Sequence, residues 1–113
     1  MKVETGIEGW HALVTGAGSG IGRAIAIAFA KAGARVTLAG RRAGPLRELH
    51  EALAPSRTFV ADGFDVTKAV AVAEGLARAR AALGPVDILV NNAGEGLSAP
   101  FEKTDLEFWS HIL

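Results

Sequence analysis

Residues Thr15 to Gly22, with the sequence TGAGSGIG, have the composition of a phosphate-binding turn. They follow an apolar run, Ala12 to Val14, and precede an amphipathic stretch that begins near Ile21. Glycines lack Cβ and allow a ligand to approach the backbone, while the first turn of a helix offers unpaired N–H groups and a positive dipole end. This pattern predicts a site for a dinucleotide pyrophosphate. The alternative is a tight corner with no ligand.

The elements that would position this turn alternate along the chain in the order of an α/β fold. Apolar runs of strand length cover residues 11–15, 35–39, 57–61 and 86–91. Helical patterns lie between them, from Ile21 to a stop at Gly33, over 45–53 and over 67–83. Strands joined by such crossovers run parallel, and the crossovers are right-handed. We therefore expect a doubly wound parallel sheet.

Composition limits the class of protein. The chain has 113 residues, of which 50% are hydrophobic and 21% charged, so we expect one domain over residues 1–113. Twelve basic residues balance twelve acidic ones, which disfavours nucleic acid as a partner. With no cysteine and three scattered histidines, we expect no metal site. No apolar stretch has the length of a membrane span or a signal peptide, so we expect no membrane partner and a cytoplasmic location.

Three motifs together resemble one family. The turn is similar to the TGxxxGIG motif of classical short-chain dehydrogenases/reductases, and the similarity continues through Asp65-Val66 and the tetrad Asn91 to Gly94 in the family's order. The general GxGxxG fingerprint fits less well, because the spacing is Gly16, Gly20, Gly22 with Gly18 in addition. The resemblance covers about residues 9–113. It implies a Rossmann-type sheet with visible strand order 3-2-1-4, the family's amino-terminal half, incomplete without further strands.

The resemblance also implies which residues bind the dinucleotide. Gly16 would form the sharp turn, Gly20 would let the backbone approach the pyrophosphate, and Gly22 would let the helix pack closely. Ser19 and Ile21 would lie beside the phosphates. The complete set is Gly16, Gly18, Ser19, Gly20, Ile21, Gly22, Arg41, Arg42, Asp65, Val66, Asn92, Ala93 and Gly94.

Two motifs further along the chain carry alternatives. By resemblance, Asp65 would hold the adenine amino group beside the Val66 backbone, but it is equally placed to cap a helix starting at Thr67. Asn91 would stabilise the sheet. Ala93 and Gly94 would leave room for adenosine and the nicotinamide-side ribose. The alternative for these last residues is an ordinary Asn/Gly turn after a strand.

The end of the second apolar run favours NADP over NAD, although NAD stays open. An acidic residue there would bind the ribose 2′-hydroxyl of NAD, whereas Arg41 and Arg42 offer bidentate donors to a 2′-phosphate. Members of the family that prefer NADP often carry a second basic residue where this chain has Ser19. Alternatively, both arginines lie on a solvated loop and pair with Glu48 or Glu51.

By resemblance, the chain is part of an NAD(P)-dependent oxidoreductase that reduces a carbonyl or oxidises an alcohol by hydride transfer. We expect a small-molecule substrate and a homo-oligomer in the complete protein. The family's catalytic tyrosine, lysine, serine and asparagine lie beyond this region, and the chain has no tyrosine, so no catalytic residue is assigned and the chain alone is expected to be inactive. The alternative is a non-catalytic dinucleotide-binding or sensing module. A Walker-type NTPase is disfavoured because Gly22 is followed by Arg23 and Ala24.

Overall fold

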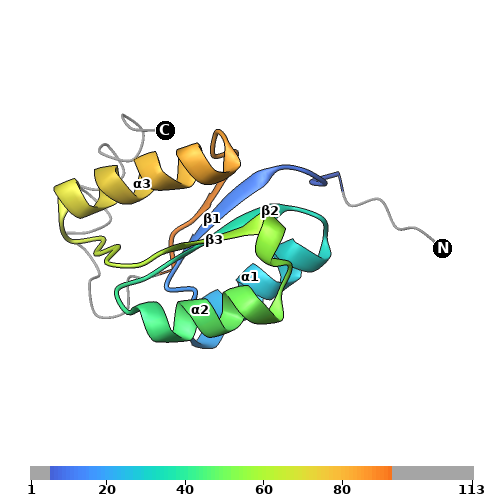
Figure 1. The fold of residues 1–113 in the computed structure, drawn as a ribbon, viewed down its shortest axis with the longest axis horizontal. Coiled ribbons are helices and arrows are strands. Elements are labelled where there is room, and N and C mark those ends of the chain that lie inside the picture. The colour runs from blue at the N-terminus through green and yellow to red at the C-terminus, as the bar shows by residue number, and fades with distance from the viewer. Residues whose placement is uncertain (1–5, 93–113) are drawn as a thin grey trace.

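A four-stranded parallel sheet forms the centre of the molecule in a computed structural model that describes residues 6–92. The strand order is β3-β2-β1-β4, as the sequence predicts. The bounds are His11–Thr15 for β1, Arg35–Ala39 for β2, Thr58–Ala61 for β3 and Ile88–Val90 for β4. The carboxyl ends of all four strands therefore lie at one edge of the sheet (Figure 1).

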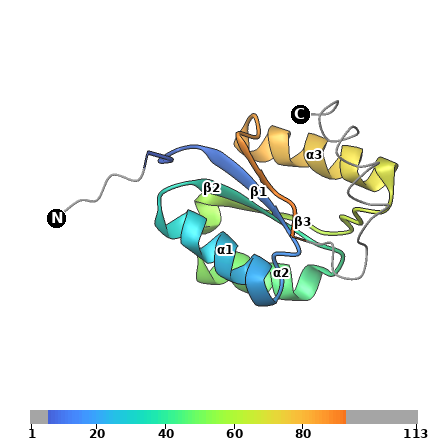
Figure 2. The ribbon, with the colours of Figure 1, turned by 180° about the vertical axis from the view of Figure 1, so that it is seen from behind.

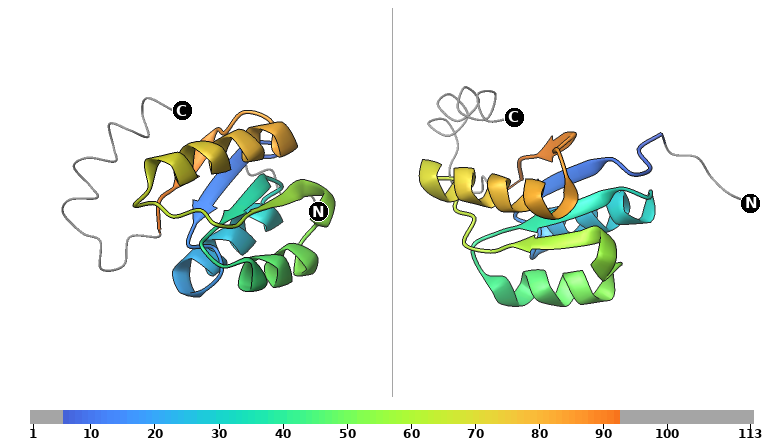
Figure 3. Two further views of the ribbon diagram at one scale, coloured as in Figure 1. Left: turned by 60° about the vertical axis from the view of Figure 1, so that its left-hand side comes forward. Right: turned by 45° about the horizontal axis from the view of Figure 1, so that its top comes forward.

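Helices cover both faces of this sheet. α1 (Gly20–Lys31) and α2 (Ala43–Ala52) lie on one face, and α3 (Ala69–Leu83) lies on the other (Figures 2 and 3). Right-handed crossovers explain this arrangement, because the chain moves outward from β1 through β2 to β3 and then returns across the sheet to β4. The reversal of direction places the third crossover helix on the opposite face.

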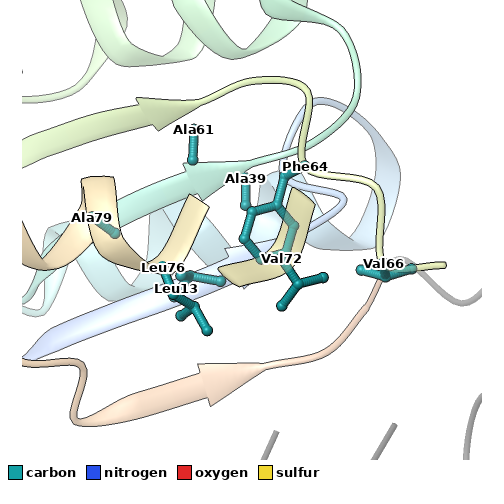
Figure 4. Packing of buried hydrophobic residues seen from close by; sticks show 8 residues of the cluster. All are labelled: Leu13, Ala39, Ala61, Phe64, Val66, Val72, Leu76 and Ala79. Carbon is teal, nitrogen blue, oxygen red and sulfur yellow. The ribbon is translucent and has the colours of Figure 1, made fainter. Parts of the chain in front are cut away.

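Each face has its own apolar core, because side chains alternate along a strand. Under α3, Leu13, Ala39 and Ala61 from three strands are buried against the helix (Figure 4). The remaining members of this cluster are Phe64, Val66, Val72, Leu76 and Ala79. The opposite core joins the sheet to α1 and α2 through Val14, Ala17, Ala26, Ala34, Val36, Leu38, Leu46 and Leu49.

The element bounds expected from the sequence match the structure for two strands and at the ends of β3 and α3, and they differ by one or two residues at several other ends. The runs 11–15 and 35–39 match β1 and β2, and α1 ends before Gly33, which has a φ of +94°. β3 begins at Thr58 instead of residue 57, because a short 3₁₀ helix occupies Pro55–Arg57. α2 begins two residues earlier than expected and α3 two residues later, and β4 spans only three residues of the expected 86–91.

At the amino end of the sheet, a buried histidine joins three elements. The Nδ1 of His11 lies 2.9 Å from the carbonyl oxygen of Gly84, the residue that ends α3, and its Nε2 lies 2.7 Å from Oγ1 of Thr37 on β2. The backbone N–H of His11 donates to Oδ2 of Asp87 at 2.9 Å. Burial lowers the pKa of His11 below its ordinary value of 6.5, the hydrogen bond to Gly84 opposes this, and the positive charge of Arg35 lowers it further.

Candidate functional site at the carboxyl ends of the strands

The turn after β1 has a backbone that requires glycine at two positions. Gly16 has a φ of +64° and Gly20 a φ of +55°, values that side chains with a Cβ rarely adopt. Between them, the Ala17 N–H donates to the Ala39 carbonyl at the end of β2, with a distance of 3.1 Å. The turn is therefore held next to the carboxyl end of the neighbouring strand.

Gly22 allows close contact between α1 and this turn. A Cβ at Gly22 would lie 2.1 Å from the carbonyl oxygen of Gly16 and 2.6 Å from Nδ2 of Asn92. Both distances are too short for any side chain, so only glycine fits at this position. The first turn of α1 consequently lies against both the glycine turn and the residues that follow β4.

The amino end of α1 presents donors to an anion. Ser19 is the N-cap residue with extended backbone, and its side chain makes no capping hydrogen bond. The first intrahelical donor is the N–H of Arg23, which bonds to the Ser19 carbonyl at 3.2 Å, and the N–H groups before it have no partner in the helix. The first turn of α1 contains no acidic residue. Its positive dipole end is therefore not compensated by a side chain.

A pocket of about 500 Å³ opens beside this helix end. This volume falls within the range of small-molecule sites. Its walls come from the glycine turn, the end of β2 and the first turn of α2. The lining residues are Gly16, Gly18, Ser19, Gly40, Arg41, Arg42, Pro45 and Leu46.

The two arginines supply the positive charge of the pocket. Both are exposed, and Arg42 is the N-cap residue of α2. Within residues 6–92 an ion pair joins Arg78 to Asp62 at 3.4 Å, and neither Arg41 nor Arg42 pairs with Glu48 or Glu51. The ion pair that the alternative interpretation of these arginines requires is therefore not formed in the described part of the chain. The guanidinium groups stand beside the glycine turn with their donors available.

Asp65 holds a turn that precedes α3. Its Oδ1 accepts hydrogen bonds from the backbone N–H of Thr67 at 2.9 Å and from Oγ1 of the same residue at 2.6 Å. These two bonds lower the pKa of Asp65 below its ordinary value. The turn delays the start of the helix to Ala69, with Lys68 as the N-cap residue, so Asp65 caps a turn and not α3 itself. Within the described residues, its Oδ2 makes no hydrogen bond.

A threonine at the end of β1 ties the asparagines to the sheet. Oγ1 of Thr15 accepts a hydrogen bond from the backbone N–H of Asn92 at 2.8 Å and lies 3.4 Å from Oδ1 of Asn91. The resemblance assigned a sheet-stabilising role to Asn91, and this contact is of that kind. This role of Thr15 was not expected from the motif, although a hydroxyl at the end of a strand whose parallel neighbour ends in Asn-Asn is the signal that could have identified it.

The structure brings only some of the expected residues together. Glycines 16 and 18, Ser19 and both arginines line one pocket, and Asn92 lies against Gly22. Asp65 and Val66 lie on the next loop, outside the pocket lining, although Gly63 of that loop donates its N–H to the Arg41 carbonyl at 3.3 Å. Ala93 and Gly94 lie outside the described residues.

Residues 6–92 contain no group of three or more His, Cys, Asp or Glu residues placed to hold a metal ion. In the same range, no helix has both the length and the apolar character needed to cross a bilayer.

Comparisons with known proteins agree with the geometry of this candidate site. A model of the short chain dehydrogenase family matches residues 10–113, and the chain therefore belongs to this family. Gluconate 5-dehydrogenase from Gluconobacter oxydans is 39% identical over 95% of this chain and 42% of the relative. D-erythrulose reductase from Gallus gallus is 42% identical over 95% of this chain and 41% of the relative. The chain thus spans about two fifths of the length of these relatives.

Solved structures of family members share the fold. The hydroxysteroid dehydrogenase from Escherichia coli superposes with a TM-score of 0.73 at 38% identity, over 78% of this chain and 37% of that one. L-sorbose reductase from Gluconobacter frateurii, solved in complex with NADPH and L-sorbose, gives a TM-score of 0.70 at 40% identity, over 81% of this chain and 36% of that one. The Rossmann-type sheet expected from the sequence is confirmed.

Proposed function

We propose that this chain is the dinucleotide-binding part of an NADP-preferring oxidoreductase that interconverts an alcohol and a carbonyl compound. The observation that carries the proposal is the single pocket that joins the glycine turn next to the amino end of α1 with Arg41 and Arg42. One wall offers backbone donors and the other offers guanidinium groups. Two separate anionic groups on one ligand, a pyrophosphate and a 2′-phosphate, match this arrangement.

The residues present fit the coenzyme. The first turn of α1 would hold the pyrophosphate through backbone N–H groups, because Gly20, with its positive φ angle and open space where a Cβ would lie, leaves the backbone accessible there. The two arginines would bind the 2′-phosphate in the bidentate manner that guanidinium favours. When bound, the nicotinamide supplies the hydride chemistry. The complex of the related L-sorbose reductase with NADPH supports this choice of coenzyme.

The adenine and ribose sides of the ligand would involve the remaining residues. Oδ2 of Asp65 is available to accept a hydrogen bond from the adenine amino group, while Oδ1 already accepts two hydrogen bonds from Thr67. We assign the Val66 backbone to the same contact, and Asn92, Ala93 and Gly94 to the path of adenosine and the second ribose. The position of Asn92 against Gly22 supports its share of this assignment.

The test is a change of charge at the arginine pair. Arg41→Asp should weaken NADPH binding by at least about tenfold more than NADH binding, since it removes charge-assisted hydrogen bonds to the 2′-phosphate alone. Isothermal titration calorimetry with both dinucleotides measures the two dissociation constants. Arg47→Asp is the matched control, because Arg47 is exposed on α2 and does not line the pocket. An equal loss for both dinucleotides contradicts the NADP assignment, and no binding of either by the unmodified protein contradicts the function.

We extend the proposal to the substrate class, the assembly and the location. The names of the relatives, gluconate 5-dehydrogenase and D-erythrulose reductase, support a small polar alcohol or ketone as substrate. We further propose a homo-oligomeric complete protein and a cytoplasmic location. Light scattering on the complete protein tests the first, since a monomer at micromolar concentration would contradict it. Fractionation of the source cells tests the second.

A further inference from the structure

The first turn of α2 packs directly against the glycine turn. A Cβ at Gly18 would lie 3.1 Å from Cβ of Pro45 and 3.7 Å from Cδ2 of Leu46. Leu46 is 1% exposed and belongs to the core between the sheet and the two helices. Because Gly18 has no side chain, the first turn of α2 can pack directly against the glycine turn, and no space is left there for a Cβ.

The end of β2 is held in the same way. A Cβ at Gly40 would lie 3.4 Å from both Cδ atoms of Leu46. The N–H of Gly40 donates to the Ala61 carbonyl at 3.2 Å, and its carbonyl accepts from Phe64 at 3.0 Å. The segment that carries Arg41 and Arg42 is therefore anchored at both ends, by Gly40 on the sheet and by Pro45 on the glycine turn.

We propose that the contact between Gly18 and Pro45 sets the separation between the pyrophosphate-binding turn and the arginine pair, and that these two residues thereby control the preference for NADPH over NADH. The inference rests on the proposed function. Gly18 and Pro45 act through Arg41 and Arg42, so they are positioning residues for the 2′-phosphate. Because both dinucleotides share the pyrophosphate, a change in this separation alters the binding of only one of them.

The experiment compares two Gly→Ala variants of the same region. Gly18→Ala adds a Cβ that requires Pro45 to give way by a few tenths of an ångström. We expect this shift to carry the arginines away from the turn. We expect NADPH affinity to fall about fivefold relative to NADH affinity, less than the loss of a whole charge-assisted hydrogen bond. Gly44→Ala is the control, since a Cβ at Gly44 has no atom within 4 Å. It should leave the ratio of the two dissociation constants unchanged.

A second variant approaches the contact from the other side. Pro45→Gly removes the Cβ that meets Gly18, so the arginine segment loses its anchor, and we expect the same selective loss of NADPH affinity. Circular dichroism and thermal unfolding establish that each variant is folded. If Gly18→Ala does not fold, Pro45→Gly alone decides.

A protein without the two arginines provides the decisive comparison. In a protein that carries Arg41→Ala and Arg42→Ala, adding Gly18→Ala should not change the ratio of NADPH to NADH affinity any further. An unchanged ratio in Gly18→Ala, or an equal loss of both dinucleotides, overturns the inference while leaving the proposed function standing. Failure of the unmodified protein to bind either dinucleotide overturns the proposed function itself.

Discussion

The hydrogen bonds of His11 define which ring nitrogen carries the proton in the neutral form. The carbonyl of Gly84 can only accept, so Nδ1 must carry a proton, and Nε2 of the neutral ring then accepts from the Thr37 hydroxyl. A second proton would place a positive charge at a side chain that is fully buried, near the guanidinium of Arg35. The carboxylate of Asp87 opposes this effect only weakly, as the last of the causes that shift the pKa of His11.

This lowered pKa predicts a loss of stability in mild acid. Below the ordinary pKa of 6.5 the unfolded chain binds a proton at His11 that the folded chain resists, so the free energy of unfolding falls as the pH falls from 6.5 toward the lowered value. Urea denaturation at pH 7.5 and at pH 5.5 measures the effect. His11→Gln should be less stable at pH 7.5, because the network is broken, but should lose less stability between the two pH values. The same pH dependence in both proteins would contradict the role of His11.

At the scale of elements, one aromatic ring positions α3. A Cβ at Gly75 would lie 2.3 Å from Cδ2 of Phe64, so the ring packs directly on the helix backbone (Figure 4). Phe64 is 2% exposed, and its N–H is bonded to the Gly40 carbonyl. The position of α3 and the path of the loop that carries Asp65 are therefore coupled through this one residue.

Gly75→Ala should destabilise the protein by about 1–3 kcal/mol, the usual cost of overpacking a core. Alanine is otherwise the better helix former, so the sign of the effect separates packing from helix propensity. Thermal unfolding measures it. Gly44→Ala, in the first turn of α2 with open space around it, is the control and should be neutral or stabilising. Stabilisation by Gly75→Ala would show that the ring moves aside without cost.

The order and type of the elements could be predicted from the sequence, while several boundaries could not. β1 and β2 are buried apolar runs with clear ends. The end of α1 before Gly33 is also predictable, because glycine readily adopts the positive φ angle found there. The expected start of α3 at residue 67 is two residues early. The helical pattern of residues 67–83 does not reveal that Thr67 donates two hydrogen bonds to the Asp65 side chain and so forms a turn before the helix. The expected start of α2 at residue 45 is two residues late, because proline favours the first helical position whereas Pro45 occupies the third.

The candidate site was predictable to a similar extent. The glycine turn and the arginine pair are local in sequence, and the structure places them around one pocket. The roles of Pro45 and Leu46 as its third wall could not be derived from the sequence, because they depend on how α2 approaches Gly18 in three dimensions. The hydrogen bonds between Thr15 and residues more than 70 positions away cannot be predicted from the sequence for the same reason.

For the whole molecule, the coenzyme should act as a stabiliser, because it binds the folded chain and not the unfolded one. With NADPH at about 100 times its dissociation constant, the gain is about 2.7 kcal/mol, which raises the unfolding midpoint by about 10 °C in a domain of this size. NADH at the same concentration should give a smaller shift. Differential scanning fluorimetry measures both, with free adenosine as the control. A shift of equal size for adenosine would contradict a phosphate-based site.

The two rims of the sheet differ in what they contain. One rim carries the glycine turn and Arg41, and the other carries the buried His11 with its contacts to Gly84 and Thr37. A substitution at Arg41 therefore falls at the opposite rim from the hydrogen bonds of His11. Exchange of the exposed Arg41 can therefore change the charge of the pocket while the buried hydrogen bonds of His11, and the stability that they contribute, stay intact.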